Sequence, residues 1–102
     1  MDVKTVKADL EEIKYYYANQ TEFDIAAKSI GSSAVAVKAK EYNTAITQAP
    51  AALYRLYTAL YVNGITQLEY ALDLDRCVDR VYKANKKLCQ FFAEYFNRIE
   101  AH

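Results

Sequence analysis

Several residue types are scarce in this 102-residue chain, and each scarcity narrows what the chain can be. It contains two glycines, one proline and no tryptophan, so few positions can interrupt a helix. Its single histidine is the terminal His102, where local order is least expected. The sequence also lacks a glycine-rich phosphate loop, a metal-ligand cluster and a nucleophile motif. We therefore expect no enzymatic activity, no bound metal and no cofactor.

The two cysteines do not indicate a disulfide or a zinc site. Cys77 and Cys89 fall on one predicted helix, which places them about 18 Å apart at 1.5 Å per residue. That separation prevents them from bridging each other, and their spacing differs from that of zinc ligands. We expect reduced thiols packed among apolar residues.

The sequence has no long apolar run and no strong charge of either sign. No segment approaches the roughly 18 apolar residues of a membrane span, and residues 1–12 lack the apolar core of a signal peptide. We therefore expect a soluble cytoplasmic protein with no membrane partner. Thirteen Lys and Arg residues balance thirteen Asp and Glu residues. Any DNA binding must come from a local basic patch, and would be weaker, more salt-sensitive, or dependent on dimerisation or a partner.

What the chain does have is hydrophobic residues at helical spacing. They make up 53% of it, which excludes disorder and indicates one compact, all-α domain. Apolar positions repeat every three or four residues over 3–30, with a weak point at residues 19–21, and Gly31 is suited to end this long helix. Ser32 or Ser33 then caps a second helix toward Gln48. The short connection predicts an antiparallel helical hairpin over residues 1–49.

Residues 50–102 are predicted to form a second unit of three helices. Pro50 opens the first of these and Asn63-Gly64 closes it. Its leucines and tyrosines form two stripes, so it should lie centrally. The stripes are Leu53, Leu56 and Leu60, and beside them Tyr54, Tyr57 and Tyr61.

Residues 66–88, TQLEYALDLDRCVDRVYKANKKL, predict a helix-turn-helix formed by helices over 65–74 and 76–100. Such a motif needs a small side chain where the two helices cross, and Ala71 supplies it. Asp75 occupies the turn. Apolar positions give each helix an inner side: Leu68, Leu72 and Leu74 on the first, and Val78, Val81 and Leu88 on the second.

Charge divides unequally between these two helices. The first carries Glu69, Asp73 and Asp75 with no basic residue. The second begins with five basic residues against one acidic residue over 76–87. A basic second helix suits a recognition helix that enters the major groove of DNA.

At these residues a family resemblance appears. The segment YVNGITQLEYALDLDRCVDRVYKANKKL is similar to the Gly-x-[Ser/Thr]-x-x-Glu-x-Ala entry of the promoter-reading region of bacterial sigma factors, which small phage regulators of the ArpU type share. It covers roughly the last 40 residues. The family's turn has Gly followed by an aliphatic residue, where this chain has Asp75 and Arg76. Asp tolerates the left-handed conformation that such a turn can require, whereas Arg76 removes an apolar anchor.

The resemblance implies a phage or prophage transcriptional regulator that binds double-stranded DNA and contacts RNA polymerase. Arg76 and Arg80 are the candidates for reading guanine edges, because a guanidinium donates two hydrogen bonds to O6 and N7. Phosphate contacts are expected nearby. The complete set of candidate DNA-binding residues is Gln67, Arg76, Asp79, Arg80, Lys83, Lys86 and Lys87.

Two alternatives remain open in the sequence. The last helix carries a coiled-coil-like seam with one polar member, Asn85, which either forms a homodimer or packs on the N-terminal hairpin. The seam consists of Val78, Val81, Asn85, Leu88, Phe92, Tyr95 and Ile99.

The second alternative concerns function, since a helical inhibitor or adaptor could keep this shape without reading DNA. Exposed, unpaired basic residues on the last helix would favour DNA binding. Pairing of the same residues with Glu69, Asp73 or Asp79 would favour the interaction module.

Overall fold

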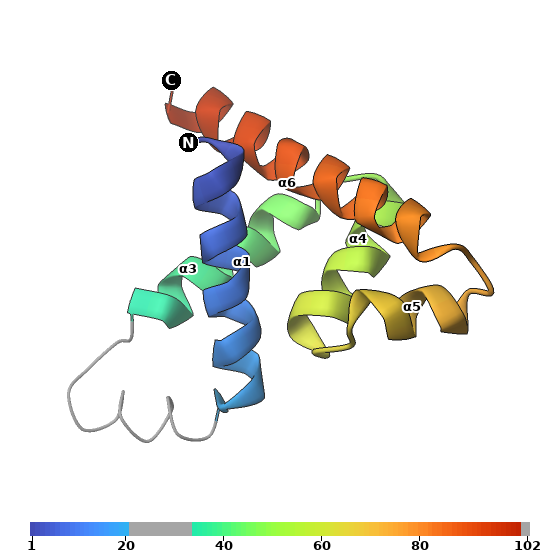
Figure 1. Ribbon diagram of the computed structural model, residues 1–102. Coiled ribbons are helices and arrows are strands. Elements are labelled where there is room, and N and C mark those ends of the chain that lie inside the picture. The colour runs from blue at the N-terminus through green and yellow to red at the C-terminus, as the bar shows by residue number, and fades with distance from the viewer. Residues whose placement is uncertain (21–33, 101–102) are drawn as a thin grey trace.

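The chain is all-α, as predicted, in a computed structural model that describes residues 1–20 and 34–100 (Figure 1). The longest described helix, α6, runs along the upper side of the view, and α1, α3, α4 and α5 all contact it. The elements in chain order are α1 (Val3–Ala18), α3 (Ala34–Ile46), α4 (Ala51–Tyr57), the π-helix η1 (Thr58–Val62), α5 (Gln67–Asp73) and α6 (Val78–Glu100).

The first helix is shorter than its apolar pattern predicts. Asp2 caps α1 by accepting the Thr5 backbone N–H, and the helix ends at Ala18. There the backbone N–H of Asn19 donates to the carbonyls of Tyr15 and Tyr16, and the Asn19 side chain also donates to the Tyr15 carbonyl at 3.0 Å. The expectation of one unbroken helix over 3–30 is therefore wrong, and the break falls at the predicted weak point. The caps expected at Gly31, Ser32 and Ser33 lie outside the described residues.

The central helix changes its winding partway along. Pro50 precedes α4 as predicted, and from Thr58 the chain continues as η1, where the Asn63 N–H reaches back five residues to the Thr58 carbonyl at 2.9 Å. This wider turn accompanies burial of both Leu60 and Tyr61. The tyrosine stripe is incomplete, because Tyr54 is 46% exposed.

The core lies where α6 crosses α1, α3 and the central helix. The ring of Tyr42 from α3 lies 4.7 Å from that of Phe92 and 4.9 Å from that of Phe96, and Tyr57 from α4 lies 5.6 Å from Phe92. Tyr42, Tyr57 and Phe92 are the largest fully buried side chains among the described residues. Tilted and edge-to-face contacts of this kind stabilise aromatic pairs.

The middle of the heptad-like seam of α6 packs against other helices of the same chain. Its members Val81, Leu88 and Phe92 are at most 3% exposed. Its polar member, Asn85, accepts a hydrogen bond from the Tyr61 hydroxyl at 2.6 Å. The middle of the seam therefore packs within the chain, while its last member, Ile99, is 53% exposed. Homodimerisation through the seam stays a prediction.

Candidate nucleic-acid interface

The residues that carry the family resemblance all shape the entry to α5. Gly64 has a left-handed φ of 74°, and Thr66 caps the helix by accepting the Glu69 N–H at 3.1 Å. The Thr66 hydroxyl also donates to the Glu69 carboxylate at 3.0 Å, and Ala71 is 1% exposed. A Thr followed three positions later by Glu is a common start for any helix. These residues explain the local geometry, so evidence for recognition must come from the charges beyond the turn.

The turn between α5 and α6 closes as the sequence suggests. Asp75 adopts a left-handed φ of 52°, and its N–H donates to the Leu72 carbonyl at 3.1 Å. The Arg76 N–H donates to the Ala71 carbonyl at 2.9 Å. These two bonds form a Schellman motif, in which glycine usually holds the left-handed position. Asp75 therefore holds the left-handed position that glycine usually occupies in this motif.

The leucines of α5 do not form the inner side that was predicted. Leu68, Leu72 and Leu74 are 57%, 70% and 47% exposed, and Ala71 is the buried residue of this helix. Within the described residues α5 contacts only α6 and η1. No described element covers the leucines, so helical spacing alone assigned them to the wrong environment.

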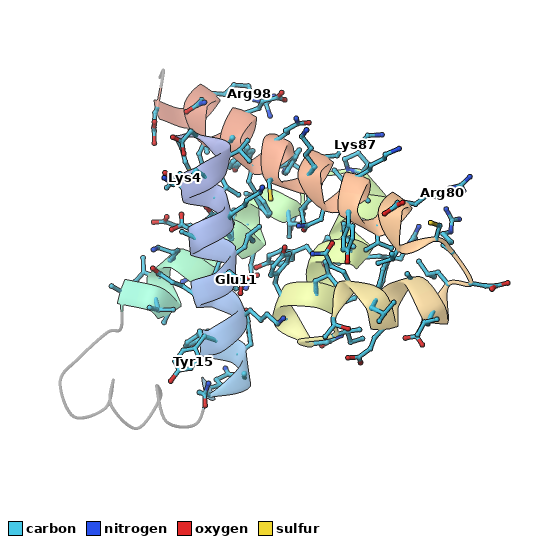
Figure 2. The ribbon with its side chains drawn as sticks, viewed as in Figure 1. Lys4, Glu11, Tyr15, Arg80, Lys87 and Arg98 are labelled. Atoms are coloured by element: carbon cyan, nitrogen blue, oxygen red, sulfur yellow. The ribbon has the colours of Figure 1, made fainter. Side chains whose placement is uncertain are left out.

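The turn before α6, which holds Arg76, and the first half of α6 present their basic residues to solvent. Arg76, Arg80 and the lysines at 83, 86 and 87 are all exposed, as is Asp79. Among the described residues none of these basic side chains forms an ion pair, and Glu69, Asp73 and Asp79 do not neutralise them. Figure 2 shows Arg80 and Lys87 pointing outward from α6, away from the helices packed beneath it. This is the arrangement expected of a surface that binds a polyanion.

Helical geometry sorts the basic residues of α6 into two rows. At about 100° per residue, a helix that turns Val81 and Leu88 inward directs Lys83 and Lys86 straight outward. Arg80 and Lys87 then share one flank of the helix. Asp79 joins the outward row, where its carboxylate lowers the local positive potential. The more strongly positive part is therefore the flank that carries Arg80.

Gln67 lies apart from these residues. It lines a hollow with Glu11, Lys14 and Tyr82, whereas Arg80 lines a different one. The Gln67 Oε1 atom is buried and has no hydrogen-bond partner in the described structure. The candidate set is thus divided, because a phosphate contact from Gln67 would have to occur outside the basic surface of α6.

Arg55 was not singled out from the sequence. It lies on α4, is exposed, and lines with Arg76 and Arg80 a hollow of about 400 Å³, called here the arginine hollow. Arg55 is the one basic residue between Lys40 and Arg76, which is the sole sequence signal that could have drawn attention to it. Only the packing of α4 against α6 brings it to the others. The remaining lining residues are Ala52, Leu56, Tyr70, Leu74, Val81 and Ala84.

The described residues do not form a metal site or a membrane span. These ranges hold no group of three His, Cys, Asp or Glu side chains that could bind a metal. Nor do they hold a helix with the length and apolarity needed to cross a membrane. Both cysteines are free: Cys89 is buried, which raises the pKa of its thiol, but Cys77 is exposed. The expectation that both thiols pack among apolar residues is therefore wrong for Cys77.

Comparison with known proteins returned no match to a protein-family model, a curated protein or a solved structure. What the chain does must therefore be inferred from the geometry and charges of its own surface.

Proposed function

We propose that this chain is a DNA-binding transcriptional regulator of the small phage type, with α5 and α6 as its helix-turn-helix. The observation that carries the proposal is the exposed and unpaired set of basic residues at Arg76 and on the first half of α6, which Arg55 of α4 extends. Phosphate neutralisation by such residues supplies most of the affinity of DNA-binding proteins. The left-handed Asp75 supports the same assignment, because it preserves the turn.

In this proposal the start of α6 enters the major groove, whose width of about 12 Å admits a helix. Arg76 and Arg80 read guanine, and Asp79 accepts a hydrogen bond from the amino group of cytosine. Lys83, Lys86, Lys87 and Arg55 contact phosphates, which position the helix without reading sequence. The neutral net charge of the chain means that this one surface must supply the electrostatic attraction.

The first test is fluorescence anisotropy of a labelled random-sequence duplex, titrated with protein between about 50 and 200 mM salt. A steep linear fall of log affinity against log salt is expected, and Lys87→Ala should reduce its slope by about 1. Lys4→Ala, an exposed lysine on α1, is the matched control and should leave the slope unchanged. No binding at about 50 mM salt, or equal losses in the two variants, would overturn the proposal.

Orientation is tested separately once a preferred operator has been selected from random sequences. Arg80→Ala should relax sequence preference at one base position, whereas Lys87→Ala should weaken all sequences alike. Identical behaviour of the two variants would show that the assumed rotation of α6 in the groove is wrong.

The exposed leucines of α5 favour a second candidate, a protein-interaction module that acts as an inhibitor or adaptor. Leu68 and Leu72 lie one helical turn apart and are 57% and 70% exposed beside Glu69 and Asp73. An apolar row with acidic neighbours suits a partner with an apolar, basic-rimmed surface. RNA polymerase is the partner that the family resemblance implies. Loss of polymerase co-elution in Leu68→Ser/Leu72→Ser, with DNA affinity unchanged, would support this role, and unchanged co-elution would contradict it.

A further inference from the structure

We infer that the arginine hollow binds a small organic anion that carries an apolar body. The hollow lies between α4, α5 and the start of α6 and combines three guanidinium groups with an apolar floor. Binding at this site does not require that the chain bind DNA.

The charge of the hollow calls for an anion. Arg55, Arg76 and Arg80 line it together, no carboxylate shares the lining, and none of the three forms an ion pair within the described residues. Arginine remains protonated at any physiological pH, so these side chains cannot relieve their mutual repulsion by losing a proton. A carboxylate or phosphate relieves it and accepts paired hydrogen bonds from the planar guanidinium forks.

The floor of the hollow calls for an apolar body on that anion. Leu74 is 47% exposed and Ala52 is exposed, so they supply apolar surface, and the buried Leu56 and Val81 lie beneath it. An inorganic ion would leave this surface uncovered. A ligand that covers it is stabilised because apolar surface is removed from water.

The size of the hollow favours a small molecule over a helical peptide. Its volume of about 400 Å³ lies within the range of small-molecule sites, roughly 300 to 1,000 Å³. Its lining residues on α4 run from Ala52 to Leu56, about 6 Å along the helix at 1.5 Å per residue. A partner helix of several turns would extend well beyond these walls, whereas a short aromatic or aliphatic acid fits between them.

One consequence rests on the proposed function. Arg76 and Arg80 are also the residues proposed to read guanine, so an anion held between them would compete with DNA. The ligand would then act as an effector that releases the regulator from its operator. This consequence requires DNA binding, whereas the ligand site itself does not.

The test uses 4-phenylbutyrate as the anionic probe and 4-phenylbutan-1-ol as its uncharged match. Each is titrated into the isotopically labelled full chain, and backbone amide shifts are followed by NMR. The acid should shift amides of α4 and of the first two turns of α6, and should bind at least tenfold more tightly than the alcohol. Equal binding of the alcohol, or shifts confined to other helices, would overturn the inference.

Two variants separate charge from shape. Arg55→Gln should weaken the acid by about tenfold or more, as expected when a charged hydrogen-bonding group is lost. Ala52→Leu keeps every arginine but fills the hollow, and should also abolish binding; Ala52 is exposed, so the fold should tolerate the larger side chain. Lys4→Gln on α1 removes one positive charge away from the hollow and should change nothing. Unaltered binding in either of the first two variants would contradict the site.

The same samples distinguish this inference from the proposed function. A chain that binds 4-phenylbutyrate in the hollow but no duplex DNA would overturn the regulator and leave the ligand site standing. A chain that binds DNA but neither probe would overturn the ligand site and leave the regulator standing.

Discussion

The first part of α6, residues 78–87, and its second part, residues 88–100, have different surroundings. They are called here its first and second halves. In the second half Leu88, Cys89 and Phe92 are fully buried beneath α1, α3 and α4. In the first half Val81 is the only residue of comparable burial, and the basic side chains around it face solvent. One continuous helix thus provides the core at one end and an open charged surface at the other.

Polar groups show the same contrast. Beside α1, the buried carboxylate of Asp9 accepts the Tyr42 hydroxyl at 2.7 Å and pairs with Lys38 at 3.0 Å. Nearby, the Tyr57 hydroxyl donates to Asn43, which donates to Tyr17. At the other end of the molecule, five neighbouring basic residues have no such partners among the described residues. Satisfied polar groups stabilise the fold, while unsatisfied exposed charges remain available to a ligand.

Alkaline pH should have the largest effect on the core. Burial is the main cause that raises the pKa of Tyr42, Tyr57 and Tyr61 above the ordinary value of 10.0. Below pH 10 these hydroxyls are protonated in both states, so their contribution to stability is intact. Above pH 10 the unfolded chain releases protons that the native chain retains, so stability falls by about 1.4 kcal/mol per pH unit for each tyrosine.

Urea unfolding between pH 8 and 11.5 measures this loss. The three tyrosines together should give a slope of about 4 kcal/mol per pH unit, to which Cys89 adds in the same direction because burial raises its thiol pKa. Tyr61→Phe should reduce this slope by about one third, because one of the three buried hydroxyls is removed. Stability that stays flat to pH 11.5 would contradict the burial of these hydroxyls.

Truncating one side chain in each region should sharpen the comparison. Phe92→Ala deletes a fully buried ring that contacts Tyr42 and Tyr57, and should lower the free energy of unfolding by about 3–5 kcal/mol. Leu72→Ala removes an apolar side chain that is 70% exposed, and should change stability by less than about 0.5 kcal/mol. Urea denaturation measures both. Similar losses of unfolding free energy in the two variants would mean that Leu72 is buried against another part of the protein.

The buried carboxylate should matter less than the aromatic core but more than surface charge. Asp9→Ala removes the carboxylate that accepts the Tyr42 hydroxyl and leaves only the weaker contact with Met1 Sδ at 3.6 Å, so it should cost about 1–3 kcal/mol. Adding Tyr42→Phe should recover part of that loss, because the hydroxyl that has lost its carboxylate acceptor is removed. Glu12→Ala is the control: its pairing with Lys38 at 2.8 Å is exposed, so the change should stay within about 1 kcal/mol. A fully additive double variant would show that Asp9 and Tyr42 are not coupled.

The smallest expected effect is at the turn. Asp75→Gly should stabilise the chain by up to about 1 kcal/mol, because glycine adopts the left-handed conformation without a Cβ penalty. Asp75→Ala should destabilise it by a similar amount. Thermal unfolding resolves both changes. Equal destabilisation by the two substitutions would indicate that the Asp75 carboxylate, rather than its backbone conformation, matters.

Helix positions were largely predictable because their signals are local. Pro50 fixes its own φ, Thr66 caps a helix start, and Gly64 and Asp75 accept the left-handed conformation, so the boundaries around α4 and α5 followed from local signals. The end of α1 was harder to predict from the sequence, because the apolar spacing continues beyond Ala18. The helix ends there, and the Asn19 side chain donates a hydrogen bond back to it. The basic residues of α6 were identified from sequence, whereas Arg55 was not.

The sequence by itself determined the all-α class, the turn between α5 and α6 and the concentration of basic residues on one helix, since helical period, backbone preference and formal charge are properties of neighbouring residues. Only the tertiary structure decided which apolar stripes are covered. It buried the middle of the α6 seam within the chain and left the leucines of α5 exposed, because burial depends on which distant helix lies opposite. It also brought Arg55 to Arg76 and Arg80, since the packing of α4 on α6 joins positions that no local rule connects.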